Sequence, residues 1–161
     1  MTARTGAAGA GETERIVDEL RRAVEGDAWH GPSLHEVLDG VTAERARARP
    51  IPGAHTIGEL VLHMASWTAE ATRRLRTGLT DTPEAGDWPR FDGSEAAWAG
   101  ARRRLDDAHR ELLAAVAAFP AARLHEPLDA DRTYADLLHG IAQHHAYHGG
   151  QITLLRRALG A

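Results

Sequence analysis

Apolar residues recur at helical spacing along most of the chain. Ile16, Leu20 and Val24 follow one another at intervals of four, which predicts a helix over residues 12–25 that ends at Gly26. Longer apolar stripes of the same period predict three further long helices, over about residues 57–78, 94–119 and 133–160. A shorter helix is expected from Leu34 to Val41.

Capping-box pairs, in which a hydroxyl residue precedes a carboxylate by three positions, support these helix starts. The pairs are Ser33 with Glu36, Thr56 with Glu59, and Thr133 with Asp136. Either Ser94 or Asp92 can cap the third long helix. No segment shows sustained alternation of period two, so strands are not indicated. The pattern predicts an all-α antiparallel four-helix bundle, with one short extra helix between the first two long helices, and the loops leave room for one long crossover.

The composition is typical of one globular domain. The chain has 161 residues, of which 43% are apolar and 26% are charged. We expect a flexible tail over residues 1–11 and a single domain over residues 12–161. The start of the chain lacks the apolar segment of a secretory signal, and no apolar run approaches the roughly 18 residues of a membrane span. A cytoplasmic protein is therefore expected.

Two compositional features narrow the chemistry. The chain contains no Cys and no Lys, and all 19 basic residues are Arg. Thiol nucleophiles, Cys ligands and Schiff-base chemistry are thereby excluded, so any reactive group must be a His, a carboxylate, a hydroxyl, a metal or a bound cosubstrate. The formal charge is −4 and the Arg residues are scattered among acidic ones, so nucleic acid is not expected as a partner.

Three histidines lie close together in `HHAYHGG`, within the last predicted helix. His148 falls on the apolar face, His144 lies about 40° to one side of it, and His145 lies about 60° to the other side. Helical periodicity hardly separates the two neighbours. The i, i+4 spacing favours His144, because it stacks two imidazoles one turn apart, as in helical metal sites. Gln151 lies on the same side, one turn beyond His148.

Two imidazoles alone would leave an ion under-coordinated, so a third ligand is expected from a facing helix. His63 is the best candidate, because it flanks the apolar face of the helix 57–78, one turn before Trp67. The alternative interpretation is that these imidazoles are hydrogen-bonded core residues, as single buried histidines commonly are. His109 stands in a charged stretch and is a weaker candidate. The pair Gly149 and Gly150 indicates a close approach of backbone or ligand inside a helix.

Several stretches of the chain are informative when they are taken together. They are `HTIGELVLHMASW` (55–67), `DWP` (87–89) with `SEAAW` (94–98), `HHAYHGGQI` (144–152) and, more weakly, `WHGPSL` (29–34). With these stretches the chain resembles the DinB-like (DinB/YfiT) superfamily of small metal-binding four-helix bundles. The resemblance implies a metal triad of His63, His144 and His148, with Gly150 and Gln151 matching a conserved GQ. His145 stands where the family often has an acidic residue. One Zn²⁺ or Ni²⁺ ion per chain and a homodimer are further implications.

A site with three neutral ligands keeps a coordination position open, as catalytic zinc does. Such a site suits a metal-dependent hydrolase, or an S-transferase that uses a low-molecular-weight thiol as cosubstrate; both activities are described in the family. Either would act on a small-molecule substrate. The alternative is a non-catalytic, stress-associated metal-binding interaction module.

Pocket residues are assigned less directly by the sequence. Trp29, Trp67 and Trp88 are expected either as pocket walls or as core filler. His30 and Gln151 are further candidates for the pocket. Glu70, two turns after His63, is either a general base or a solvated helix carboxylate.

Overall fold

A computed structural model describes residues 11–160, and it confirms the expected all-α bundle. The four long helices are α1 (Glu12–Glu25), α4 (Ile57–Thr77), α5 (Glu95–Ala117) and α6 (Tyr134–Ala158). The shorter elements are α2 (Leu34–Leu38), α3 (Ala43–Arg47) and the 3₁₀ turn η1 (Ala121–Arg123). The expected tail over residues 1–11 lies, apart from Gly11, outside the described residues. Among the described residues, no helix combines the length and the apolar character that a membrane crossing requires.

The predicted capping boxes are all formed. In each, the hydroxyl accepts a hydrogen bond from the backbone three residues on, and the carboxylate there accepts one from the backbone of the cap. Ser94, not Asp92, caps α5: its Oγ accepts from the backbone N–H of Ala97, and Asp92 accepts from the backbone N–H of Ser94. These side chains satisfy amides that the first helical turn leaves unpaired.

One expectation about the short extra helix is wrong. A single helix through Val41 was expected, but the structure has two short helices there. Gly40 adopts a left-handed backbone with φ 68°, which ends the first helix after Leu38. Thr42 then caps α3 by accepting a hydrogen bond from the backbone N–H of Arg45. Val41 is buried although it lies between the two short helices, so the apolar stripe continues across the break.

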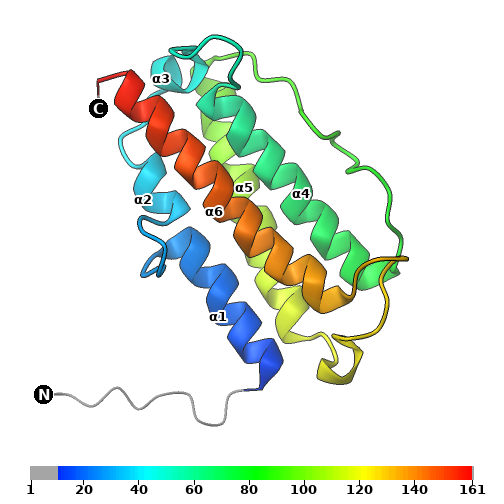
Figure 1. Cartoon of the computed structure of the whole chain (residues 1–161). Helices are drawn as coiled ribbons and strands as arrows, with labels where there is room; N and C mark the ends of the chain where they lie inside the picture. Colours follow the sequence, from blue (N-terminus) through cyan, green and yellow to red (C-terminus); the bar gives the residue numbers. More distant parts are fainter. Residues whose placement is uncertain (1–10, 161) are drawn as a thin grey trace, which may run out of the picture.

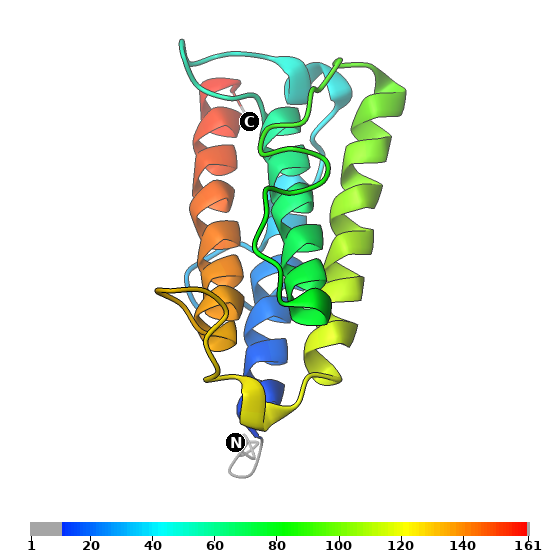
Figure 2. The same ribbon diagram turned by 90° about the vertical axis from the view of Figure 1, so that its right-hand side faces the viewer.

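The long loop 78–94 makes the crossover for which the sequence left room. Figure 2 shows this loop returning along the whole length of α4. The contacts agree: Arg74 meets Asp81, Ser66 meets Gly86, and Gly58 lies against Phe91. As a result α5 starts beside the start of α4, and these two helices point the same way. The antiparallel pairs are α4 with α6 and α1 with α5 (Figure 1).

The core consists of two apolar clusters, one toward each end of the bundle. The first joins the start of α4 to the end of α6 and includes Leu60, Met64 and Ile152. The second joins the end of α4 to the start of α6 and includes Leu75 and Leu138. The middle turns of α4 and α6 carry buried polar side chains between these clusters.

His109 is buried, although its sequence neighbours are charged. It is 2% exposed, and its Nε2 lies 3.3 Å from a carboxylate oxygen of Glu25 on α1. Its pKa is lowered from 6.5, chiefly because burial disfavours the charged ring; the carboxylate of Glu25 offsets only part of this effect. The sequence missed this burial because Asp106, Asp107 and Arg110 surround a position that faces α1.

We predict that Gly58→Ala destabilises the bundle. A methyl group there would lie inside van der Waals contact with the ring of Phe91, so the crossover loop would have to move. The expected loss is about 1–3 kcal/mol in the free energy of unfolding, measured with urea. Gly140→Ala on α6 is the matched control, because it meets no atom within 4 Å and should stabilise by about 0.5–1 kcal/mol. Equal effects of the two changes would contradict the close loop packing.

We predict that His109 makes the fold sensitive to acid. Because its pKa is lower in the folded chain than in the unfolded one, its contribution to stability is complete above about pH 6.5 and decreases as the pH falls below that value. His109→Gln cannot titrate, so it should lose less of its free energy of unfolding between about pH 7 and pH 5 than the wild type does. The measurement is urea unfolding at each pH. An identical loss in both proteins would contradict the burial of a neutral imidazole.

Candidate metal centre

Two antiparallel helices bring the three predicted ligands together. His63 lies in α4, and His144 and His148 lie one turn apart on α6. The Nε2 atom of His144 is 2.9 Å from Nε2 of His63 and 3.0 Å from Nε2 of His148. All three ligand atoms lie within 4.8 Å of one another, and no other such group of His, Asp or Glu occurs in residues 11–160. We call these residues the triad.

Hydrogen bonds on the outer side of two triad rings fix their tautomers. Nδ1 of His63 donates to the backbone oxygen of Asp87 at 2.6 Å, and Nδ1 of His148 donates to Oε1 of Gln151 at 2.6 Å. Because a carbonyl oxygen only accepts, each Nδ1 carries the proton and each Nε2 presents a lone pair. Gln151 therefore orients a candidate ligand.

The lone pairs of the triad fit a bound cation. A proton on Nε2 of His144 can satisfy only one of the two acceptors beside it, so one short nitrogen contact stays unfavourable without a cation. Nδ1 of His144 is buried without a hydrogen-bond partner, so no outer contact fixes the tautomer of this ring. In a tetrahedral zinc site the ligand nitrogens are about 3.3 Å apart. The separations of 2.9 and 3.0 Å between Nε2 of His144 and the other two Nε2 atoms are close to this value. The donor set and its geometry therefore suit a divalent ion.

Burial keeps the α6 members of the triad neutral. It lowers the pKa of His144 to about 4, with smaller effects from His148 and His63. The pKa of His148 is also lowered, first by burial, and Gln151 opposes this shift. A neutral imidazole is the form that binds a metal, so protons compete weakly for these two rings near neutral pH.

His145 points away from the triad. It is fully buried, and its Nε2 lies 3.0 Å from Oγ1 of Thr68. The Thr68 hydroxyl donates to the backbone oxygen of Met64, so it must accept its contact with the imidazole. Burial lowers the pKa of His145 to about 3. The structure thus places His144 in the cluster and gives His145 the hydrogen-bonded core role that the sequence left open.

The three tryptophans, which were expected as pocket walls or as core filler, occupy three different environments. Trp29 is completely exposed, and Trp67 donates from Nε1 to Oδ1 of Asp87 at 2.7 Å. The ring of Trp88 stacks on His63 at 3.9 Å and on His55 at 3.6 Å, nearly parallel to both. Since both of its faces are covered by imidazoles, Trp88 offers only its edge to a ligand.

The structure separates His30 from the triad. His30 and Trp29 line a hollow of about 380 Å³ between α1 and α6. Gln143 and Ala146, which line the same hollow, lie roughly 140° and 160° around α6 from His148. His30 therefore faces a different part of the surface from the candidate metal centre.

Glu70 is neither a solvated carboxylate nor a free base. It is 3% exposed and accepts hydrogen bonds at 2.8–2.9 Å from the guanidinium groups of Arg73 and Arg74. Burial raises its pKa, but the hydrogen bonds from the two Arg side chains outweigh burial, and the net pKa is lowered. Glu70 is thus an ionised structural group within α4.

The glycine pair of α6 marks no unusually close approach. A Cβ at Gly149 would be 3.4 Å from a methyl of Leu34, which is ordinary contact, and a Cβ at Gly150 would meet nothing within 4 Å. A close backbone contact instead occurs at Gly58, as described above. The structure therefore shows no close approach of other backbone at this pair.

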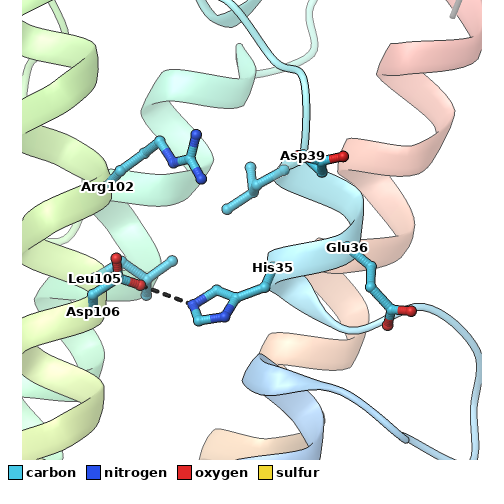
Figure 3. Close-up of a pocket in the computed structure, with 7 residues that line it drawn as sticks. His35, Glu36, Asp39, Arg102, Leu105 and Asp106 are labelled. Carbon is cyan, nitrogen blue, oxygen red and sulfur yellow. Dashed lines mark hydrogen bonds and ion pairs between the residues drawn. The ribbon is translucent and has the colours of Figure 1, made fainter.

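A separate cavity of about 620 Å³ lies between α2 and α5. In Figure 3, Nε2 of His35 pairs with Oδ1 of Asp106 at 2.9 Å, and Arg102 on α5 lies farther along the same cavity. Its lining contains no member of the triad. This cavity therefore stands apart from the candidate metal centre.

The sequence did not predict the hydrogen bonds that join α4 to the crossover loop beside His63. Asp87 and Ser66 lie in stretches that carry the family resemblance, but neither was given a role. One signal for these groups was available. His63, Ser66 and Trp67 carry polar atoms on one side of α4, and buried polar atoms need hydrogen-bond partners. Those partners come from the crossover loop, whose path the sequence does not encode in any simple periodicity.

Comparison with known families agrees with this geometry. A family model described as the DinB superfamily matches residues 28–152, which include the whole triad and most of the chain. Comparison with curated proteins gives no match. Comparison with solved structures likewise gives none. By its family match, this chain belongs to the DinB superfamily.

Proposed function

We propose that the chain is a metal-dependent enzyme that holds one divalent ion on His63, His144 and His148 and acts on a small molecule. The observation that carries the proposal is the convergence of three Nε2 atoms, two of them fixed as lone pairs by Asp87 and Gln151. Imidazole donors suit Zn²⁺ and Ni²⁺. No carboxylate joins the triad within the described residues, so the ion would keep its full positive charge.

A catalytic role fits the packing better than a structural one. Apolar clusters on both sides of the triad supply the core of the bundle without an ion. Burial of each large apolar side chain there contributes about 1.5–3 kcal/mol, so the fold does not depend on three imidazoles. Structural zinc sites, by contrast, have four protein ligands. Three ligands leave room for a reactant.

The ion would supply Lewis acidity, which activates either water for hydrolysis or a low-molecular-weight thiol for S-transfer. The protein's own groups prepare the ligands: Asp87 and Gln151 hold the protons of two rings on the far side, and burial keeps His144 and His148 neutral. A thiol would have to be supplied, because the chain contains no Cys.

Aromatic edges flank the site where a substrate would approach. Tyr147 is 66% exposed with its ring 5.0 Å from that of His148, and Trp88 is 39% exposed with its ring 6.3 Å from the same imidazole. Such a rim favours a substrate with an apolar or flat group beside the reacting atom.

We predict one divalent ion per chain in the purified protein, measured by elemental analysis. His63→Ala, His144→Ala and His148→Ala should each lower the affinity for the metal by more than about 100-fold. Loss of a group that only hydrogen-bonds to a ligand already costs about 10–100-fold, and loss of the ligand itself should cost more. His145→Gln is the matched control: it keeps a donor for Thr68 and should keep the full metal content. Unchanged metal content in His144→Ala would overturn the ligand assignment.

We predict turnover by the metal-loaded protein in one of two assays. One supplies a thiol with the electrophile monochlorobimane, and the other supplies an activated ester or amide. His144→Ala should reduce the active assay at least about 100-fold, because the ion that activates the nucleophile is lost. If neither assay shows turnover with Zn²⁺, Ni²⁺ or Mn²⁺, the non-catalytic module becomes the better account.

A further inference from the structure

One turn of α4 attaches to the crossover loop at three points. Nδ1 of His63 donates to the backbone oxygen of Asp87 at 2.6 Å, Oγ of Ser66 donates to the backbone oxygen of Gly86 at 2.6 Å, and Nε1 of Trp67 donates to Oδ1 of Asp87 at 2.7 Å. We call the loop segment Gly86–Trp88 the clasp. These contacts link two stretches about 20 residues apart in sequence.

The clasp depends on side chains because its backbone belongs to no helix. Gly86, Asp87 and Trp88 lie in the crossover loop, directly after a turn at Glu84 and Ala85. Regular secondary structure would pair backbone carbonyls automatically, but here each carbonyl needs a side-chain donor. The indole of Trp67 adds a hydrogen bond to a carboxylate, which is stronger than one between neutral groups. Trp67 and Ser66 together therefore determine where the oxygen of Asp87 lies.

The position of that oxygen determines the state of His63. A carbonyl oxygen 2.6 Å from Nδ1 holds the proton there and directs the lone pair of Nε2 toward His144. The carboxylate of Asp87 is also near, with Oδ1 3.3 Å from Nδ1. A shift of the loop would free the ring to take its other tautomer, in which Nε2 carries a proton and binds no metal.

Stacking on Trp88 restrains the orientation of the His63 ring, in addition to its tautomer. The two rings are 3.9 Å apart and 9° from parallel, so rotation of the imidazole out of its plane would meet the indole. His55 covers the opposite face of Trp88 at 3.6 Å and 5°. Nδ1 of His55 in turn lies 3.4 Å from Glu59. The indole is thus fixed from both sides.

We propose that Trp67 and Asp87 are positioning residues, which fix the tautomer and orientation of His63 through the clasp. The assignment changes the role of Trp67 from a pocket wall to a hydrogen-bond donor behind a ligand. Its consequence for metal affinity rests on the proposed function, whereas its consequence for the His63 tautomer does not.

Metal affinity tests the clasp with four variants. Trp67→Phe keeps an aromatic ring but loses the donor, and Asp87→Ala loses the acceptor; each should weaken Zn²⁺ binding by about 10–100-fold. The double variant should be little weaker than the worse single variant, because both remove the same hydrogen bond. Asp87→Asn retains an acceptor oxygen and should largely restore the affinity.

Trp98→Phe is the matched control for loss of an indole hydrogen bond. Nε1 of Trp98 donates to the backbone oxygen of Val41 at 2.8 Å, within the core and away from the triad. This variant should lose stability and keep its metal affinity. Wild-type affinity in Trp67→Phe, or independent losses that multiply in the double variant, would overturn the proposal.

The tautomer of His63 gives a readout that needs no metal. In ¹⁵N NMR of the metal-free protein, His63 should carry its proton on Nδ1, and Trp67→Phe should produce a mixture of tautomers while Trp98→Phe should not. Absence of Zn²⁺ binding by the wild type, together with this NMR result, would reject the proposed function and retain the clasp. An unchanged His63 spectrum in Trp67→Phe would reject the clasp, whatever the metal content.

Discussion

Three imidazole nitrogens lie together in one buried space between α4 and α6. The rest of the site depends on which proton or cation satisfies their lone pairs. Two of the nitrogens are held as lone pairs, so at 2.9–3.0 Å from His144 they cannot both be satisfied by its single proton. An unsatisfied buried polar group costs about 1–3 kcal/mol. The apolar clusters on either side tolerate a cost of this size. A bound cation would remove this cost, so the geometry of the fold favours metal binding at the triad.

The path of the chain explains how the site is held. Because the crossover loop returns along α4, α5 starts beside the start of α4, and a loop carbonyl lies behind His63. A short hairpin between α4 and α5 would leave that side of α4 open to solvent. On the other helix, Gln151 performs the same task for His148 from only three residues away. His148 is therefore oriented by a neighbour on its own helix, whereas His63 is oriented by a contact that is distant in sequence.

This difference also decides what the sequence could predict. Helix positions and caps follow from local patterns, so Thr56, Thr133 and the ends of α1 were predicted correctly. The i, i+4 spacing of His144 and His148 is local in the same way, and His63 followed from its place beside an apolar stripe. The break at Gly40 was missed because the apolar pattern continues across it. The roles of Asp87, Trp67 and Glu70 were missed because each depends on side-chain partners that periodicity does not indicate.

X-ray absorption spectroscopy of the zinc-loaded protein tests the central claim most directly, because it counts the imidazoles around the ion. Three histidine ligands are expected, together with at least one further light-atom ligand that the protein does not supply. Parallel spectra of His145→Gln should be identical to those of the wild type. A site with two or fewer imidazoles, or one completed by protein carboxylates, would contradict the account.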